Sequence, residues 1–599
     1  MAQFPVVDLF AGPGGLGEGF STFESPESPA GYRPFRVIAS VEKDSAACRT
    51  LRLRNFYRHL LWAGHAAALD HYYAYVRGER DSPLDPAQPD VAAIWQMVFH
   101  DVLEQPLGEP ETSIRLRSRI EQAGITPHTP LLLIGGPPCQ AYSSAGRSRN
   151  AGNSQYRPEL DGRHFLYRIY LELLREYQPV AFILENVKGM LSSHIGGRRL
   201  FPRILQDLTS PALTDGQDGR RIRPRYRIYS IVDGFCYSYD QPADAVQHSR
   251  FIVQAEHYGI PQARHRVILI GLREDLARIF DQRGGVFPRL SPLTDASGQL
   301  RHISTREALA DLPPLHSRLS WLRSELPIGD WASTLATLVE RFAPLIEDEN
   351  LRVAFIQAAN QAAVDTQHLS VAAPLQTGRP AELSDWYRGS DPPLVLNHEV
   401  RSHMPEDLAR YLFCAVHARQ YGVSPKAAHF PAALAPRHRN WESGKFNDRF
   451  RVQVAEQPST TIVSHFAKDG HYAIHRILRE RPRRLRRGGR AGRTKFGFFL
   501  ECAELRIAIT IRTLNNFAVS IANALNHPLR DLRVETSRGT NGNTPKIGTG
   551  FLAFGDFGFH HVPGLESLNA FLSSQIAARE SIGIESSSLI TAASRRFNR

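Results

Sequence analysis

The sequence predicts an α/β fold, a doubly wound and mostly parallel sheet with helices on both faces. Short apolar runs recur along residues 1 to about 275, as expected for strands buried on both sides. A glycine-rich turn follows the first run, and single carboxylates follow several others. Ligands of such folds bind outside the carboxyl ends of the strands, so these residues would gather around one crevice.

The first predicted strand, Val6–Phe10, leads into the glycine-rich turn Ala11–Gly17. Glycine adopts left-handed backbone conformations and lets a ligand approach the main chain just before a helix begins. Such a turn alone is weak evidence for a cofactor. The candidate cofactor contacts in this stretch are Phe10, Ala11, Gly12, Gly14, Gly15 and Leu16.

Two acids could complete a nucleotide-like site. Glu42 ends the run Arg36–Val41, at roughly the distance where nucleotide-binding α/β folds place a carboxylate on ribose hydroxyls. Asp101 follows Met97–His100 and could accept a hydrogen bond from an adenine amino group in the same crevice. The plainer interpretation of each acid is a solvated carboxylate at the end of a strand.

A single cysteine follows the apolar run Leu131–Ile134, inside the sequence Gly-Gly-Pro-Pro-Cys-Gln. Because proline fixes φ, the thiol of Cys139 would be aimed into the crevice at the strand end, where a nucleophile belongs. A lone Pro-Pro-Cys is more often an ordinary buried turn. The case for catalysis therefore depends on the motifs that accompany it.

Two later segments supply charged partners for such a nucleophile. The run Val180–Val187 contains Glu185 directly after five apolar residues, and the run Tyr258–Gly271 contains Arg264 and Arg266. Strand side chains alternate, so the two guanidinium groups should point toward one site. Structural ion pairs are the alternative role for both arginines.

In this order, the motifs resemble those of the DNA cytosine-5 methyltransferases. They read Phe-Ala-Gly-Pro-Gly-Gly, Gly-Pro-Pro-Cys-Gln, Glu-Asn-Val and Gln-Ala-Arg-His-Arg. The resemblance covers residues 1 to about 275 and returns at 445–475, through Phe446–Phe450 and Pro458–Ile462. It implies a Rossmann-like S-adenosylmethionine-dependent methyltransferase domain with a smaller, mixed target-recognition domain.

The resemblance also implies a mechanism on a cytosine flipped out of double-stranded DNA. Cys139 would add to carbon 6, Glu185 would hold or protonate N3, and Arg266 would stabilise charge on O2. Arg264 would orient either Glu185 or the target nucleotide. The resemblance adds Lys43 and Pro137 to the cofactor contacts, although the family often has an aromatic residue at the position of Lys43.

The expected domains are a catalytic domain at 1–275, a target-recognition region at 276–444, a return to the catalytic domain at 445–475, and a basic tail at 476–599. Of the net charge of +12, the stretch 476–495 contributes +9, through nine arginines, one lysine and one glutamate. A basic chain suits a polyanionic partner such as DNA. The tail lacks the family's closing motifs. We hypothesise that residues 476–599 replace a lost C-terminal portion after a reading-frame shift, and a genuine alternative domain is the other interpretation.

The remaining composition indicates a soluble, cytoplasmic protein. Its five cysteines have no Cys-x-x-Cys spacing, so neither a disulfide framework nor a metal site is expected. Its apolar runs are too short for a bilayer, and no charged leader precedes an apolar segment. We expect a monomer without a membrane partner, with cognate restriction or phage-defence proteins as further candidate partners.

Two other functions stay open. The chain could be an inactive DNA-binding relative whose incomplete pocket does not hold the cofactor. It could also be a transfer-RNA cytosine-5 methyltransferase, although the Cys-Phe-Thr signature of that branch is absent.

Overall fold

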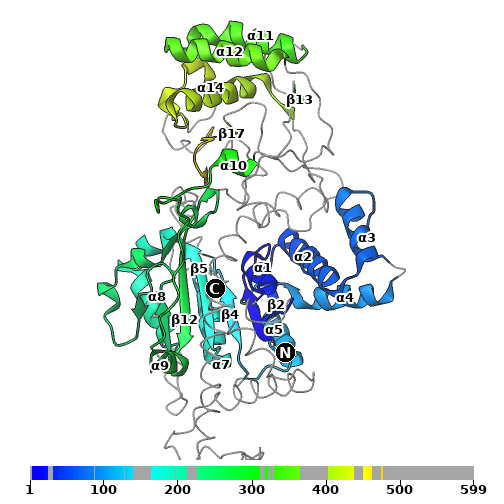
Figure 1. The fold of residues 1–599 in the computed structure, drawn as a ribbon, viewed down its shortest axis with the longest axis vertical. Coiled ribbons are helices and arrows are strands. Elements are labelled where there is room, and N and C mark those ends of the chain that lie inside the picture. Colours follow the sequence, from blue (N-terminus) through cyan, green and yellow to red (C-terminus); the bar gives the residue numbers. More distant parts are fainter. Residues whose placement is uncertain are drawn as a thin grey trace, which may run out of the picture.

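The computed structural model shows a sheet domain with a separate helical module above it (Figure 1). It describes residues 3–24, 31–85, 88–126, 129–138, 163–195, 197–211, 225–282, 284–309, 318–320, 326, 329–364, 402–436, 441, 450–461 and 474–475. Within these residues, no helix has both the length and the apolar character needed to cross a membrane.

The large sheet has the order β3-β2-β1-β4-β5-β12-β8-β9, and β10 also pairs with β12. Its strands are β1 (Phe4–Leu9), β2 (Phe35–Glu42), β3 (Val102–Glu104), β4 (Leu132–Gly135), β5 (Ala181–Val187), β8 (Tyr226–Tyr229), β9 (Cys236–Tyr237), β10 (Ile252–Gln254) and β12 (His265–Arg273). Strands β3 to β5 of this order are parallel, and β12 is antiparallel to β5 and β8. The predicted doubly wound α/β fold is confirmed.

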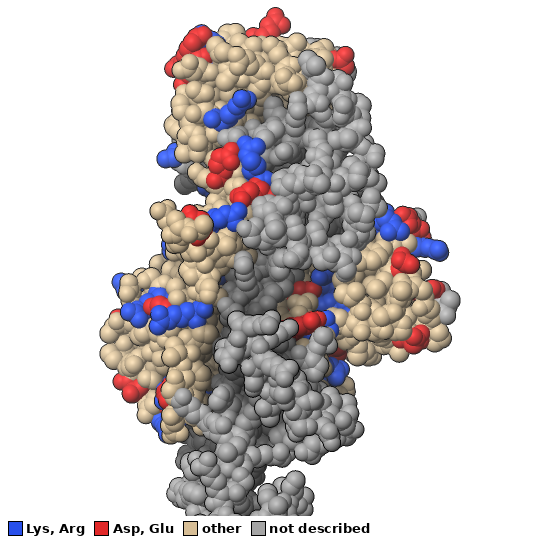
Figure 2. Space-filling model, in the orientation of Figure 1, with Lys and Arg blue, Asp and Glu red and all other residues tan. Residues whose placement is uncertain are grey.

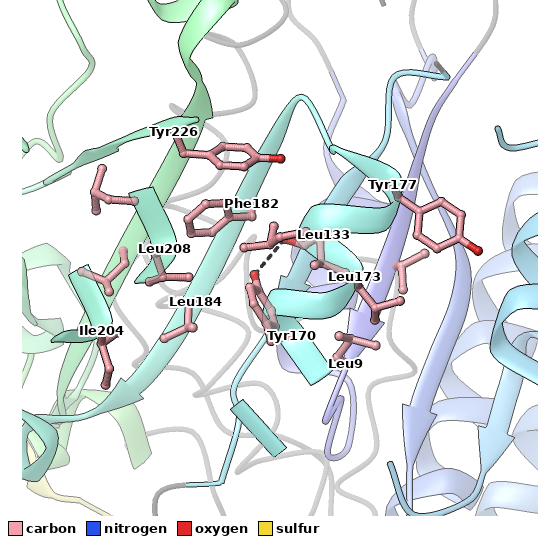
Figure 3. Close-up of a cluster of buried hydrophobic side chains, with 14 of the residues drawn as sticks. Leu9, Leu133, Tyr170, Leu173, Tyr177, Phe182, Leu184, Ile204, Leu208 and Tyr226 are labelled. Atoms are coloured by element: carbon pink, nitrogen blue, oxygen red, sulfur yellow. Dashed lines mark hydrogen bonds between the residues drawn. The ribbon is translucent and has the colours of Figure 1, made fainter. Parts of the chain in front are cut away.

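The central strands are apolar throughout because both faces of the sheet are covered. Alternate residues of β1 and β4 enter two different cores: Val6 and Ile134 lie in one, and Val7 and Leu133 lie in the other. In the second core, the hydroxyl of Tyr170 donates to the carbonyl oxygen of Leu133 at 3.2 Å (Figure 3). The same hydroxyl lies 3.0 Å from the carbonyl oxygen of Ile183. This buried tyrosine links the helix that contains it, α7 (Arg163–Tyr177), to β4, the strand that precedes Cys139.

Helices cover the sheet and form an insertion beside it. The sheet helices are α1 (Gly15–Thr22), α5 (Pro110–Gln122), α7 (Arg163–Tyr177), α8 (Leu200–Thr209) and α9 (Glu274–Gln282). Between β2 and β3 the chain forms α2 (Ser45–Ala63), α3 (Ala66–Arg77) and α4 (Pro89–Asp101). Glu18 on α1 forms ion pairs with Arg54 (2.7 Å) and Arg58, so the insertion is anchored to the helix after the glycine-rich turn.

The upper module has its own core. It contains α11 (Trp331–Phe342), α12 (Glu349–Val364) and α14 (Pro405–Tyr421), which pack around Leu338, Phe355, Leu412 and Phe413. Residues just after the expected boundary at 275 still pack on the sheet: α9 lies against β12, and Phe287 stacks on Tyr229 with ring centroids 4.1 Å apart.

Several short elements complete the described structure. They are β6 (His194–Ile195), β7 (Arg198–Arg199), β11 (Gln262–Ala263), α10 (Thr305–Leu309), β13 (Arg318–Leu319), β14 (Ser402–His403), β15 (Val452–Gln453), β16 (Ser459–Thr460) and β17 (Ile474–His475). The sheet pairs among them are β6 with β7, β11 with β16, β13 with β14 and β15 with β17. The pair formed by β11 and β16 joins the catalytic domain to the segment returning from the helical module.

Candidate active site

The glycine-rich turn lies between β1 and α1, as predicted. Three of its residues have left-handed backbone, Phe10 (φ 57°), Gly12 (φ 57°) and Gly14 (φ 99°). The positive φ of Gly14 favours glycine there, and a Cβ would also lie 2.6 Å from Cδ2 of Leu51, whose side chain would have to shift. Left-handed backbone is costly for phenylalanine and marks ligand sites more often than ordinary loops.

Glu42, at the end of β2, joins this turn. Its Oε2 accepts a hydrogen bond from the Gly12 amide at 2.9 Å, and its Oε1 accepts from the amides of Lys43 and Asp44 at 2.8 Å each. A carboxylate can accept about four hydrogen bonds, so capacity remains for a ligand hydroxyl. Lys43 is exposed at the same edge, and Phe10, Ala11 and Leu16 are half-buried around the turn.

Asp101 has a different environment from the one its sequence context suggested. The run Met97–His100 is the end of α4, and Asp101 is the last residue of that helix, directly before β3. Its buried carboxylate accepts a hydrogen bond from Nε of Arg119 at 3.1 Å. Burial raises the pKa of Asp101, and Arg119 opposes this rise. Glu104, rather than Asp101, lies level with Glu42 across the strand pair.

The segment before the candidate nucleophile is packed tightly between neighbouring strands. A Cβ on Gly135 would lie 2.5 Å from the carbonyl oxygen of Leu9, and one on Gly136 would lie 2.9 Å from Oε2 of Glu185. The side-chain amide of Asn186 donates to the carbonyl oxygen of Pro137 at 3.1 Å. Cys139 itself lies outside the described residues.

The structure brings two predicted catalytic residues together. Nε of Arg266 lies 2.8 Å from Oε1 of Glu185, and their side chains are 14% and 29% exposed. They come from the adjacent antiparallel strands β12 and β5, in which Arg266 lies opposite Val187. The ion pair is thus partly open to solvent, beside Gly136.

Arg264 departs from the regular alternation expected of one continuous strand. It lies between β11 and β12 and is buried, with 6% of its surface exposed. Its amide donates to the carbonyl oxygen of Gln262 (2.8 Å), and its carbonyl accepts from Ala255 (3.1 Å). Between the two arginines, Nε2 of His265 lies 2.7 Å from Oε1 of Glu256.

Two residues of the site were missed at the level of sequence. Asn186 could have been found, because it is a second polar residue at the end of the same apolar run, directly after Glu185. Asp8 gave no signal inside an apolar run, yet it is completely buried, and neither of its carboxyl oxygens has a hydrogen bond among the described residues. A Cβ on Gly17 would lie 3.0 Å from Oδ2 of Asp8, so this carboxyl group lies directly beneath the start of α1.

We expect Asp8 to make stability depend on pH. Burial, opposed by the nearby Gly17 amide and assisted by the charge of Glu42, raises the pKa of Asp8 to about 8. In the unfolded chain an aspartate ionises near pH 4 (about 3.9), so folding takes up a proton between pH 4 and 8. The wild-type free energy of unfolding should therefore fall as pH rises through this window, and level off above pH 8.

Asp8→Asn removes this titration and keeps the shape of the side chain. Its free energy of unfolding, relative to wild type, should rise by on the order of 1 kcal/mol per pH unit between pH 5 and 8. Urea unfolding at several pH values measures the difference. A difference that does not change with pH would contradict the buried, protonated state of Asp8.

The described surface carries charges of both signs. On the face drawn in Figure 2, lysine and arginine side chains lie beside acidic ones in small groups separated by uncharged surface. The strongly basic stretch 476–495 lies outside the described residues. No group of three or more His, Cys, Asp or Glu side chains suited to a metal occurs within the described part of the chain.

The site fits a ligand that carries ribose hydroxyls, because a glycine-rich turn and the carboxylate of Glu42 meet at one strand edge. The family model for C-5 cytosine-specific DNA methylase matches residues 109–211 and 247–322. These ranges contain the Gly-Pro-Pro-Cys-Gln, Glu-Asn-Val and Gln-Ala-Arg-His-Arg motifs.

Similar proteins are bacterial methyltransferases. Type II methyltransferase M.Bpa9945I of Bacillus paralicheniformis is 27% identical over 492 residues, which cover 78% of this chain and 86% of that protein. Type II methyltransferase M.AquIA of Picosynechococcus is 26% identical over 320 residues, which cover 52% of this chain and 89% of that protein. Together with the matched family model, these similarities show that the chain contains a C-5 cytosine-specific DNA methylase domain.

Proposed function

We propose that this protein methylates carbon 5 of cytosine in double-stranded DNA, through a covalent adduct of Cys139 with carbon 6 of a flipped base. The observation that carries the proposal is the ion pair between Glu185 and Arg266. Glu185 lies beside Gly136, which precedes Cys139 by three residues in the sequence. An acid and a guanidinium at this place suit a ring that gains electrons when a thiolate adds to it.

Each residue has a defined task in this reaction. The Cys139 thiolate forms a bond to carbon 6, and the displaced ring electrons make carbon 5 nucleophilic. Glu185 holds or protonates N3, and Arg266 stabilises the charge that develops on O2. After carbon 5 is methylated, loss of its proton returns electrons to the ring and breaks the bond between sulfur and carbon 6.

S-adenosylmethionine supplies the methyl group as an electrophilic sulfonium. Glu42 would bind the ribose hydroxyls of the cofactor, and the main chain of the turn from Phe10 to Leu16 would lie against the cofactor. Pro137 and Lys43 would complete the pocket, and Asp101 would reach the adenine after exchanging its contact with Arg119. The protein would act as a monomer in the cytoplasm, together with restriction or phage-defence proteins.

Methyl transfer tests this function directly. Labelled S-adenosylmethionine is incubated with unmethylated duplex DNA and, in parallel, with transfer RNA, and the labelled bases are identified after hydrolysis. Label in 5-methylcytosine from DNA supports the proposal, and label in transfer RNA would favour the other branch of the fold. No label in either nucleic acid, together with no binding of S-adenosylmethionine in calorimetry, would favour the inactive DNA-binding relative whose pocket does not hold the cofactor.

Arg266→Lys is expected to lower kcat by about 10²-fold, because a point charge cannot hold both Glu185 and a pyrimidine oxygen as a guanidinium fork does. Steady-state rates at saturating DNA measure the loss. Arg273→Lys is the matched control, since Arg273 lies on the same strand in an ion pair with Asp275 (2.8 Å) at the other end. Equal losses in the two variants would indicate a structural role for Arg266.

A further inference from the structure

The segment that returns from the helical module joins the catalytic domain beside the arginines. Its strand β16 runs parallel to β11, with Ser459 opposite Gln262 and Thr460 opposite Ala263. The two strands are almost two hundred residues apart in sequence. This pairing therefore places the segment that follows the predicted recognition region against the residues that directly precede Arg264.

Three hydrogen bonds fix the contact. The amide and the hydroxyl of Ser459 each donate to the carbonyl oxygen of Pro261, both at 3.0 Å. The hydroxyl of Thr461 donates to the carbonyl oxygen of Ala263 at 2.7 Å. All the acceptors are backbone carbonyls within three residues of Arg264, so the contact fixes main-chain direction rather than a side chain.

The backbone around Arg264 needs such support more than that around Arg266. Arg266 is paired on both sides within β12, with Val187 of β5 on one side and Val253 of β10 on the other. Arg264 precedes this paired region, at the break between β11 and β12. A small rotation of the Gln262–Ala263 segment would turn the Arg264 side chain while leaving Arg266 in place.

The same segment is tied to the core of the helical module. Gln453 is buried, and its Oε1 accepts a hydrogen bond from the Thr460 amide at 2.7 Å. Its Nε2 donates a hydrogen bond to the Thr460 hydroxyl at 3.0 Å. Its neighbour Val452 lies in the same core as Phe450 and the helices α11, α12 and α14. Fewer than ten residues thus connect that core with the backbone before Arg264.

We infer that Ser459 and Thr461 are positioning residues for Arg264, and that through them the placement of the helical module sets the direction of this arginine. The inference rests on the proposed function, in which Arg264 serves the methyl-transfer site. Displacing the module on DNA would act on the arginine through the carbonyls of Pro261 and Ala263.

A neighbouring contact offers a matched control. The hydroxyl of Thr305 donates to the carbonyl oxygen of Gln457 at 2.8 Å in the same junction. It is the same kind of bond, from a threonine to a main-chain carbonyl, but it does not touch the segment before Arg264. If both hydrogen bonds only stabilised the junction, loss of the Thr305 hydroxyl and loss of the Thr461 hydroxyl should lower kcat equally.

The test compares Thr461→Val with Thr305→Val. At saturating DNA and cofactor, Thr461→Val should lower kcat roughly three- to tenfold, the range expected from loss of one hydrogen bond, with KM for DNA within about twofold. Thr461→Ser keeps the hydroxyl group and should retain a kcat near that of the wild type. Thr305→Val should also leave kcat near that of the wild type. An unchanged kcat in Thr461→Val, or equal losses in both valine variants, would overturn the inference.

A second measurement does not depend on turnover. Hydrogen exchange of the Gln262–Arg264 amides should be faster in Thr461→Val than in wild type, and unchanged in Thr305→Val. Absence of methyl transfer by the wild type would count against the proposed function alone, whereas identical exchange in the two variants would contradict the positioning role.

Discussion

Cys139→Ser should abolish methyl transfer to DNA, with a fall in kcat of roughly 10⁴-fold or more, as for removal of a nucleophile from other enzymes. A serine hydroxyl is far less acidic than a thiol, whose ordinary pKa is about 8.5, and it adds poorly to an aromatic ring. The segment before Cys139 is held by Asn186 and by the close packing of Gly135 and Gly136, so the substitution should leave the fold intact.

Cys236→Ser is the control for this experiment. Burial raises the pKa of Cys236 to about 11, so its thiol stays protonated and unreactive at neutral pH. Its variant should retain wild-type kcat. Calorimetry should show that Cys139→Ser still binds S-adenosylmethionine if the wild type does. More than about one per cent residual kcat in Cys139→Ser would count against a covalent mechanism.

The strands of the site could be predicted because their sequences carry a strong physical signal. Parallel strands covered on both faces must be apolar along their whole length, and β1, β4 and β5 fall on the predicted runs. Polar residues directly after such runs are placed at the strand ends by geometry alone. Glu185 meets Arg266 because β12 runs antiparallel to β5, which places the beginning of β12 at the carboxyl end of β5. The strand period predicted a common direction for Arg264 and Arg266, but Arg264 lies outside β12.

The remaining features depend on tertiary packing that no local pattern contains. Met97–His100 is apolar enough for a strand but belongs to α4, because the insertion packs it against α2. Asp101 consequently meets Arg119 at the beginning of β3. The contact of Thr461 with Ala263 joins residues 198 positions apart, beyond the reach of any sequence period.

Glu185→Gln should lower kcat by about 10²–10⁴-fold, the usual contribution of a general acid or base. Glutamine keeps the size of the side chain but cannot transfer a proton to N3, and it leaves the guanidinium of Arg266, 14% exposed, without its carboxylate. Methyl-transfer rates at saturating DNA measure the effect. Glu176→Gln is the control, because Glu176 is 33% exposed and also paired with an arginine, Arg117, but lies on α7.

A double-mutant cycle then separates the two roles of this carboxylate. If Glu185 acts on N3 while Arg266 acts on O2, both residues stabilise the same transition state. The fold-loss of kcat in the double variant should then exceed that of either single variant but stay below the product of the two single losses. If Glu185 serves only as a counter-ion for Arg266, Arg266→Lys in the glutamine background should cost nothing further. Retention of more than a tenth of wild-type kcat in Glu185→Gln would exclude proton transfer through this residue as a large part of catalysis.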